Sequence, residues 1–141
     1  MANFRQVCSS QLIPVIAAHL QRSSIEQPEW VSVVKTSHTK EMPPQDAEWF
    51  YHRTAAVFRT IAIKNGVGVG GLKKIYGANK NRGVCKSHRF ECSGAVIRAS
   101  IKALEQLGYV EKRVGANDKA IRFVTPNGQR QLDNLAASLL K

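Results

Sequence analysis

Apolar residues recur every three or four positions in four segments, and this period predicts four amphipathic α-helices. We expect these helices over residues 10–22, residues 47–64, residues 93–107 and from Pro126 onward. The second helix has two apolar stripes, which is typical of a helix at the centre of a core. Phe50, Thr54, Val57 and Ile61 form one stripe, and Trp49, Ala56 and Ile63 form the other.

Shorter elements are predicted between these helices. Residues 72–76 fit a short helix with Leu72, Ile75 and Tyr76 turned inward. Residues 28–31 fit a helical turn that places Trp30 against the core. The residues that we expect in the core are Trp30, Trp49, Phe50, Val57, Ile61, Ile97, Ile101 and Leu104.

The apolar period changes after Gly108. Residues 109–113 and 119–124 fit two strands, joined by a turn at residues 115–118, so they predict a β-hairpin. Thr125 then fits the N-cap of the last helix, with Pro126 in its first position. Residues 78–92 lack an apolar period, and we expect a basic loop with at most a short strand near residues 88–90.

The order helix, short helix, helix, β-hairpin is that of a winged helix-turn-helix. The fold class that we predict is therefore mainly α, with a β-hairpin wing and extra helices at both ends. We expect one domain over residues 1–141, because 141 residues are enough for one compact core.

The composition supports a globular protein. Hydrophobic residues make up 43% of the chain and charged residues 22%. No stretch reaches the ~18 apolar residues of a membrane span, so we expect a soluble, intracellular protein. Three cysteines without tight spacing argue against a disulfide framework.

Positive charge is concentrated in one segment. Residues 59–102 contain ten Lys and Arg but only one acidic residue, Glu91, and therefore hold +9 of the formal net charge of +11. Such a concentration favours a polyanionic partner, with nucleic acid ahead of an anionic membrane. The candidate phosphate-binding residues are Arg53, Arg59, Lys73, Lys74, Lys80, Arg82, Lys86, Arg89, Arg98 and Lys102. Any single one of them can also be an ordinary solvated charge.

Other kinds of site find little support. Residues 66–71 match G-x-G-x-x-G, but they follow a predicted helix and not the strand that a dinucleotide site needs. Cys85, His88 and Cys92 lack the spacing of a zinc site. No local motif pairs carboxylates or supplies an activated nucleophile. We therefore expect no catalytic residues, metal, cofactor or small-molecule substrate.

Seven short motifs, in order along the chain, resemble the eukaryotic and archaeal family of small-subunit ribosomal protein nineteen. They are PEWV at 28–31, WFYHR at 49–53, GVG at 68–70, KIYG at 74–77, SH at 87–88, ALE at 103–105 and TPNGQR at 125–130. The resemblance covers about residues 8–140. Two positions depart from the family pattern, since Arg98-Ala99 stands where the family has two arginines, and RFEC at 89–92 replaces a serine- and basic-rich run.

The resemblance implies a winged-helix protein in the head of the small (40S) subunit. It would bind small-subunit ribosomal RNA, contact other head proteins and be needed for RNA maturation and subunit assembly. Arg53, Arg59 and Arg98 fall on arginines of the family pattern, and Trp49 falls on its core tryptophan. The implied location is the cytoplasmic ribosome, with assembly in the nucleolus if the source is eukaryotic.

The alternative is a winged-helix transcription regulator that reads duplex DNA. It requires base-reading side chains along helix 93–107. The exposed face of that helix offers Arg98, Lys102, Glu105 and Gln106, which are few for this purpose. A membrane-surface role would need basic residues interleaved with aromatic residues on a helix, whereas most basic residues here lie in predicted loops.

Overall fold

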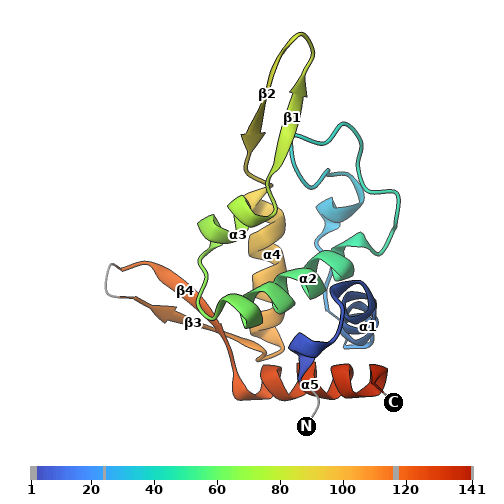
Figure 1. Cartoon of the computed structure of the whole chain (residues 1–141), viewed down its shortest axis with the longest axis vertical. Helices are drawn as coiled ribbons and strands as arrows, with labels where there is room; N and C mark the ends of the chain where they lie inside the picture. Colours follow the sequence, from blue (N-terminus) through green and yellow to red (C-terminus); the bar gives the residue numbers. More distant parts are fainter. Residues whose placement is uncertain (1–2, 24, 116–117, 141) are drawn as a thin grey trace.

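Helix α2 (Trp49–Lys64) runs through the middle of the molecule, with other helices on both of its sides (Figure 1). The computed structural model describes residues 3–23, 25–115 and 118–140. The elements before α2 are η1 (Phe4–Gln6), α1 (Ser9–Arg22) and η2 (Glu29–Ser32). Those after it are α3 (Val69–Ile75), β1 (Ala78–Arg82), β2 (Cys85–Phe90), α4 (Gly94–Gln106), β3 (Val110–Val114), β4 (Ala120–Val124) and α5 (Pro126–Leu139).

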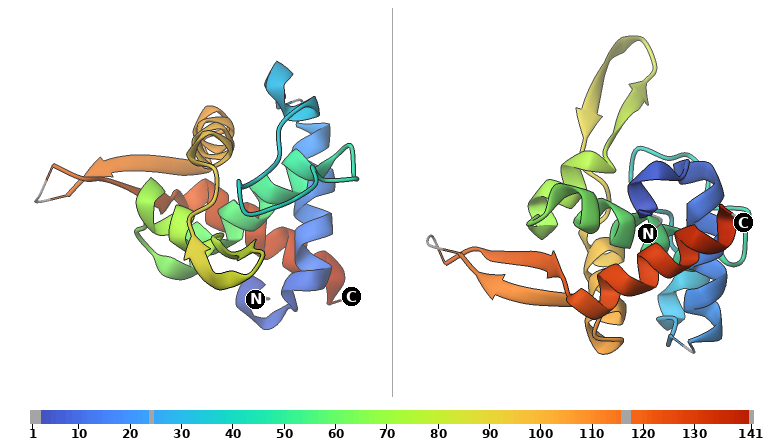
Figure 2. Two further views of the ribbon diagram at one scale, coloured as in Figure 1. Left: turned by 90° about the horizontal axis from the view of Figure 1, so that it is seen from above. Right: turned by 60° about the horizontal axis from the view of Figure 1, so that its bottom comes forward.

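The predicted winged-helix order is confirmed. Helices α2, α3 and α4 are followed by the antiparallel β3–β4 hairpin, which we call the wing. Helices α1 and α5 add to this arrangement at its two ends. Two hairpins leave the helical body in different directions, the wing on one side and the β1–β2 hairpin at one end (Figures 1 and 2). Among the described residues, none of the helices has the length and apolar character needed to cross a membrane.

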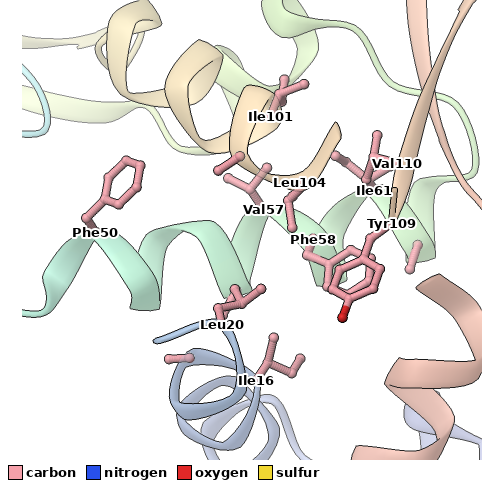
Figure 3. Packing of buried hydrophobic residues seen from close by; sticks show 14 of the residues in the cluster. Ile16, Leu20, Phe50, Val57, Phe58, Ile61, Ile101, Leu104, Tyr109 and Val110 are labelled. Atoms are coloured by element: carbon pink, nitrogen blue, oxygen red, sulfur yellow. The ribbon is translucent and has the colours of Figure 1, made fainter. Parts of the chain in front are cut away.

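The core forms where α2 lies between α1 and α4. Leu20 of α1 and Leu104 of α4 pack on opposite sides of α2, around Val57 (Figure 3). Burying a side chain of this size contributes about 1.5–3 kcal/mol relative to leaving it in water. The residues predicted for the core that are buried are Trp49, Phe50, Val57, Ile61, Ile97, Ile101 and Leu104.

Trp30 differs from the other residues predicted for the core. It is only partly buried and packs against the edge of the core from η2. Trp49 takes the deeper position, and its indole Nε1 donates to the Val31 carbonyl at 3.3 Å. The turn that carries Trp30 is thus joined to α2 through the carbonyl of the next residue, Val31.

The second apolar stripe predicted on α2 is only partly correct. Trp49 is 9% exposed, but Ala56 is half-buried and Ile63 is 39% exposed. Ala56 and Trp49 line an open pocket together with Thr36, Pro44 and Asp46, so an irregular segment and not a helix borders this part of the stripe. A helix stripe is buried only where a neighbouring element covers it, and α1 and α4 cover the other stripe.

Helix α3 begins earlier than the sequence predicted, at Val69, and Gly68 is its N-cap. Leu72 is fully buried as expected, whereas Ile75 is 41% exposed, so its predicted inward position was wrong. The residues before α3 are held in place. Val67 N donates to Arg122 O at 3.3 Å, and Arg122 N donates to Val67 O at 3.1 Å, which links this connector to the wing.

The predicted basic loop at residues 78–92 is instead a hairpin for most of its length. Strands β1 and β2 pair antiparallel, and all six residues of β2 are exposed. We call residues 78–90 the arm. Its sequence has no period-two pattern, because such a pattern arises only when one face of a strand is buried.

Of the N-caps predicted for α4 and α5, only that of α5 makes a side-chain capping hydrogen bond. Thr125 Oγ1 accepts a hydrogen bond from Gly128 N at 3.1 Å, as expected of the N-cap of α5. Ser93 is the N-cap residue of α4, but its side chain makes no capping hydrogen bond. The turn predicted at residues 115–118 includes residues 116–117, which lie outside the described residues.

Candidate nucleic-acid-binding surface

The arm carries four of the ten candidate residues. Lys80 and Arg82 lie on β1, and Lys86 and Arg89 lie on β2. No acidic residue occurs between residues 78 and 90. The end of the arm away from the body is thus a positively charged projection, with Val84 fully exposed at its turn (Figure 1).

The base of the arm is joined to α3 by charged side chains. Lys73 Nζ lies 2.8 Å from Glu91 Oε2, and Arg89 Nη2 donates to the Lys74 carbonyl at 3.0 Å. The hydrogen bond from Lys73 holds the pKa of Glu91 below its ordinary value. Lys73 and Arg89 therefore have structural partners, whereas the Lys74 side chain is exposed on the same helix.

Helix α4 adds Arg98 and Lys102 to this region. Both are exposed and lie one turn apart, about 6 Å along the helix axis. A Cβ at Gly94 would lie 2.8 Å from Arg98 Nη1 and 3.5 Å from Lys73 Cδ. Arg98 and Lys73 therefore converge over the first turn of α4, and the glycine there leaves room for both side chains.

Arg53 emerges from α2 on the side of Tyr76. The Arg53 guanidinium lies over the Tyr76 ring at 4.8 Å, a cation–π arrangement. Tyr76 Oη and Thr60 Oγ1 lie 2.9 Å apart, and burial raises the pKa of Tyr76. Within the described part of the chain, Arg53 Nη1 and Arg59 Nε are buried without a hydrogen-bond partner.

A pocket of about 400 Å³ opens beside Arg53. Helix α2 forms one side of it, and residues 36–46 form another. Its lining includes Trp49, His52 and Tyr76. Asp46 lines the same pocket, so the pocket is bordered by both an acidic and a basic side chain.

The candidate residues thus do not form a single cluster. Arg53, Lys73, Lys74, Arg89 and Arg98 lie around the C-terminal end of α3 and the first turn of α4. Arg59 lies further along α2. Lys80, Arg82 and Lys86 lie further out on the arm. Lys102 lies one turn along α4 from Arg98.

The wing supplies basic residues that the candidate set does not include. Lys112 and Lys119 are exposed on the wing. Arg113 pairs with Glu111, and Arg122 Nε lies 3.7 Å from Glu105 Oε1. The sequence signal that could have found this surface is a lysine on each side of the predicted turn, within a hairpin that winged-helix proteins often use for binding.

The remaining chemistry is sparse. Within the described ranges, no three His, Cys, Asp or Glu residues gather as they would around a metal ion. Cys8 and Cys85 are exposed free thiols, and burial raises the pKa of the Cys92 thiol. The arrangement suits binding of phosphates by Arg forks and Lys ammonium groups.

Comparison with known proteins finds one family and relatives that match nearly the whole length of the chain. The profile of the family "Ribosomal protein S19e" matches residues 3–141. The protein is 45% identical over 139 residues to small ribosomal subunit protein eS19A of Saccharomyces cerevisiae, covering 97% of this chain and 94% of the relative. It is 44% identical over 133 residues to eS19 of Emericella nidulans, covering 94% and 88%.

A plant relative extends the comparison beyond fungi. Small ribosomal subunit protein eS19 of Oryza sativa subsp. japonica is 38% identical over 133 residues, covering 94% of this chain and 88% of the relative. The match of the profile and these three relatives runs through the winged-helix elements and both hairpins. This chain belongs to the ribosomal protein S19e family.

Proposed function

We propose that this protein is a structural constituent of the small (40S) ribosomal subunit. The observation that carries the proposal is its membership of the S19e family over nearly its whole length, with relatives named as small ribosomal subunit proteins. The family is one of ribosomal proteins and not of enzymes. The protein would therefore act by binding and positioning RNA.

Small-subunit ribosomal RNA is the partner that the charged surface fits. Five of the candidate residues, Arg53, Lys73, Lys74, Arg89 and Arg98, lie around the end of α3, where their charges can neutralise several closely spaced phosphates. Phosphate contacts fix position and orientation and do not read sequence, so folded RNA would be recognised by its shape. The ten proposed RNA-binding residues remain Arg53, Arg59, Lys73, Lys74, Lys80, Arg82, Lys86, Arg89, Arg98 and Lys102.

The surroundings of α4 favour recognition of folded RNA by its shape over the reading of a duplex DNA sequence. Glu26 and Pro28 line the same groove as Lys102 and Gln106 of α4. The segment before η2 thus flanks the C-terminal half of the helix that a DNA-binding winged helix would insert into the major groove. The acidic side chain of Glu26 beside this helix would repel DNA phosphates that approach it.

The wider proposal follows the family. The protein would reside in the head of the subunit beside other head proteins, in cytoplasmic ribosomes, and would be needed for maturation of the small-subunit RNA. In a eukaryote its assembly would begin in the nucleolus. One buried cluster that includes Phe4 and Ala136 supports our expectation of one domain.

The test is replacement of the two yeast relatives, eS19A and eS19B. A tagged copy of this protein is expressed in yeast cells depleted of both, and lysates are sedimented at low and moderate salt. We expect co-migration with the small subunit and with full ribosomes at both salt concentrations. A free pool at the top of the gradient, with the bound fraction on chromatin, would reject the proposal in favour of a DNA-binding regulator.

Two double variants then test the surface itself. Lys73→Ala/Lys74→Ala and Arg98→Ala/Lys102→Ala remove two charges each from α3 and α4. We expect both to fold and to bind small-subunit RNA more weakly, with the salt slope reduced by ~0.7–0.9 for each phosphate that is no longer neutralised. Unchanged binding by both variants would show that this face does not contact RNA.

A further inference from the structure

The pocket beside Arg53 is bordered by side chains of opposite charge. Arg53 lines one part of it and Asp46 another, and Asp46 Oδ2 lies 3.7 Å from Nε2 of His52, which also lines the pocket. The arginine would attract a bare phosphate, but the carboxylate would repel it. The polar groups of the pocket include donors on Arg53 and acceptors on Asp46. The pocket is therefore suited to a neutral group whose edge both donates and accepts hydrogen bonds.

Aromatic rings form part of the lining of the same pocket. Trp49 and Tyr76 border it, and Ala56 of α2 adds only a methyl group. Its volume is about 400 Å³, and sites for small ligands commonly measure ~300–1,000 Å³. Aromatic side chains pack favourably against other flat ring systems. The lining therefore suits a flat ring as well as a polar edge.

Contacts on both sides hold the pocket in shape. On the side of α2, the Arg53 guanidinium lies over the Tyr76 ring at 4.8 Å, and Tyr76 Oη lies 2.9 Å from Thr60 Oγ1. On the other side, the Thr36 carbonyl accepts a hydrogen bond from Ser93 N at 3.0 Å, which joins the irregular segment to the start of α4. A site that exists before its ligand arrives loses little conformational entropy when the ligand binds.

The pocket adjoins the basic residues around the end of α3. Tyr76 is the C-cap of α3, and Lys73 and Lys74 lie in the last turn of that helix. Arg98 converges with Lys73 over the first turn of α4. An RNA strand whose phosphates lie on these basic residues would therefore pass close to the pocket.

We infer that the pocket binds one unpaired base of the small-subunit RNA, while the basic residues around the end of α3 hold the neighbouring phosphates. This inference rests on the proposed function and adds a contact with a base to the contacts with phosphates. A base is neutral and flat, and its edge carries donors and acceptors. Unpaired RNA bases are commonly bound by stacking on aromatic side chains and by hydrogen bonds to their edges. A segment of a neighbouring protein is the alternative occupant.

The first test uses the fluorescence of Trp49, whose side chain borders the pocket. Trp30→Phe leaves Trp49 as the only tryptophan. The probes are the RNA heptamer UUUGUUU and a ribose-phosphate chain of equal length that lacks every base. Both chains carry the same phosphates, so a difference between them reports on the bases. We expect the heptamer to quench the fluorescence and to bind roughly 5- to 150-fold more tightly, as the stacking of one base would produce.

Two pocket variants of the Trp30→Phe protein show whether the base lies in the pocket. Ala56→Leu fills the pocket without a change in charge, and Ala18→Leu, at an exposed position of α1, is the matched control. We expect Ala56→Leu to bind both probes equally and Ala18→Leu to keep the preference for the heptamer. Asp46→Asn removes the carboxylate without added volume and should reduce the preference, so it carries the test if melting shows that Ala56→Leu does not fold. Equal binding of the probes by the Trp30→Phe protein, or a preference that survives in the pocket variants, would overturn the inference.

The second test looks for the base in assembled subunits. Small subunits are isolated from yeast cells that contain this protein, or one of its variants, in place of eS19A and eS19B. Reagents that modify the Watson–Crick edges of unpaired bases then probe the RNA. We expect one base that is protected with the wild type and with Ala18→Leu to become reactive with Ala56→Leu. An unchanged pattern would overturn the inference, because a protein or water would then occupy the pocket. Absence of the wild-type protein from the subunits would instead reject the proposed function.

Discussion

The Lys73 ammonium lies 2.8 Å from the Glu91 carboxylate and joins α3 to the residue that follows β2. Glu91 is the one acidic residue among the ten basic ones between residues 59 and 102. The pair therefore neutralises one of the charges that we assign to RNA binding, and it does so at the base of the arm. Changing Glu91 should affect both the affinity for RNA and the stability of the fold.

Neutralising Glu91 should strengthen RNA binding. Glu91→Gln removes a negative charge from the surface and frees the Lys73 ammonium for a phosphate. We expect the salt slope for small-subunit RNA to increase by up to ~0.7–0.9, the value of one added phosphate contact. Glu29→Gln on η2 changes the net charge equally and is the control. Weaker binding by Glu91→Gln would show that the pair is needed to hold the arm in its binding position.

Acid should weaken the ion pair between Lys73 and Glu91 in a defined pH range. The pKa of Glu91 is lowered in the folded protein from an ordinary value of 4.5, chiefly by its hydrogen bond from Lys73. A carboxylate with a lowered pKa stabilises the fold fully above its unfolded pKa, and this contribution disappears as the pH falls through the folded pKa. Thermal melting of wild type and Glu91→Gln should therefore converge as the pH falls below about 4.5. A constant difference between the two down to the lowest pH would contradict this assignment.

Gly77 should not accept a side chain. A Cβ at this position would lie 2.5 Å from the Phe90 carbonyl oxygen and 3.2 Å from the Lys74 carbonyl oxygen. We expect Gly77→Ala to destabilise the protein by ~1–3 kcal/mol, as measured by chemical unfolding, because the arm must move away from α3. Gly70→Ala is the matched control, since a Cβ there has no neighbour within 4 Å. Gly70→Ala should leave the free energy of unfolding unchanged or raise it slightly, because alanine favours the helical conformation more than glycine does.

Trp49 should be essential for stability. Its side chain is 9% exposed, its ring meets Phe50 edge to face, and its Nε1 hydrogen-bonds the Val31 carbonyl. We expect Trp49→Ala to cost ~3–5 kcal/mol in the free energy of unfolding. Val33→Ala, at a residue that is 80% exposed, should change little. A Trp49→Ala protein with an unaltered melting temperature would remove this residue from the core.

The helices were predictable because each buries one side. In α4, Ile97, Ile101 and Leu104 lie in a single buried stripe, and this stripe is visible as a period in the sequence. The errors occur where burial depends on a distant element. Ile63 and Ile75 fit apolar periods, but they are 39% and 41% exposed.

The arm could not be predicted from hydrophobic pattern at all. Its strands are stabilised by backbone pairing between Lys80 and His88 and their neighbours, and every residue of β2 is exposed. The positive charge of the arm was visible in the sequence, because it depends only on which residues are present and not on how they fold. The sequence did not indicate that Lys73 is paired with Glu91, nor that the pairing of the two strands shifts by one residue between Lys80 and Arg82, because both depend on how the strands pair.

The arm also has consequences for the protein before it meets any RNA. A ribbon of only two strands has two open edges, and open edges can pair with another chain and start aggregation. Lys80, Arg82, Lys86 and Arg89 make the arms of two copies repel each other. The repulsion weakens as salt screens it. The same charges that would bind RNA in the subunit therefore keep free copies of the protein apart, and high salt without RNA is the condition under which the arm should promote self-association.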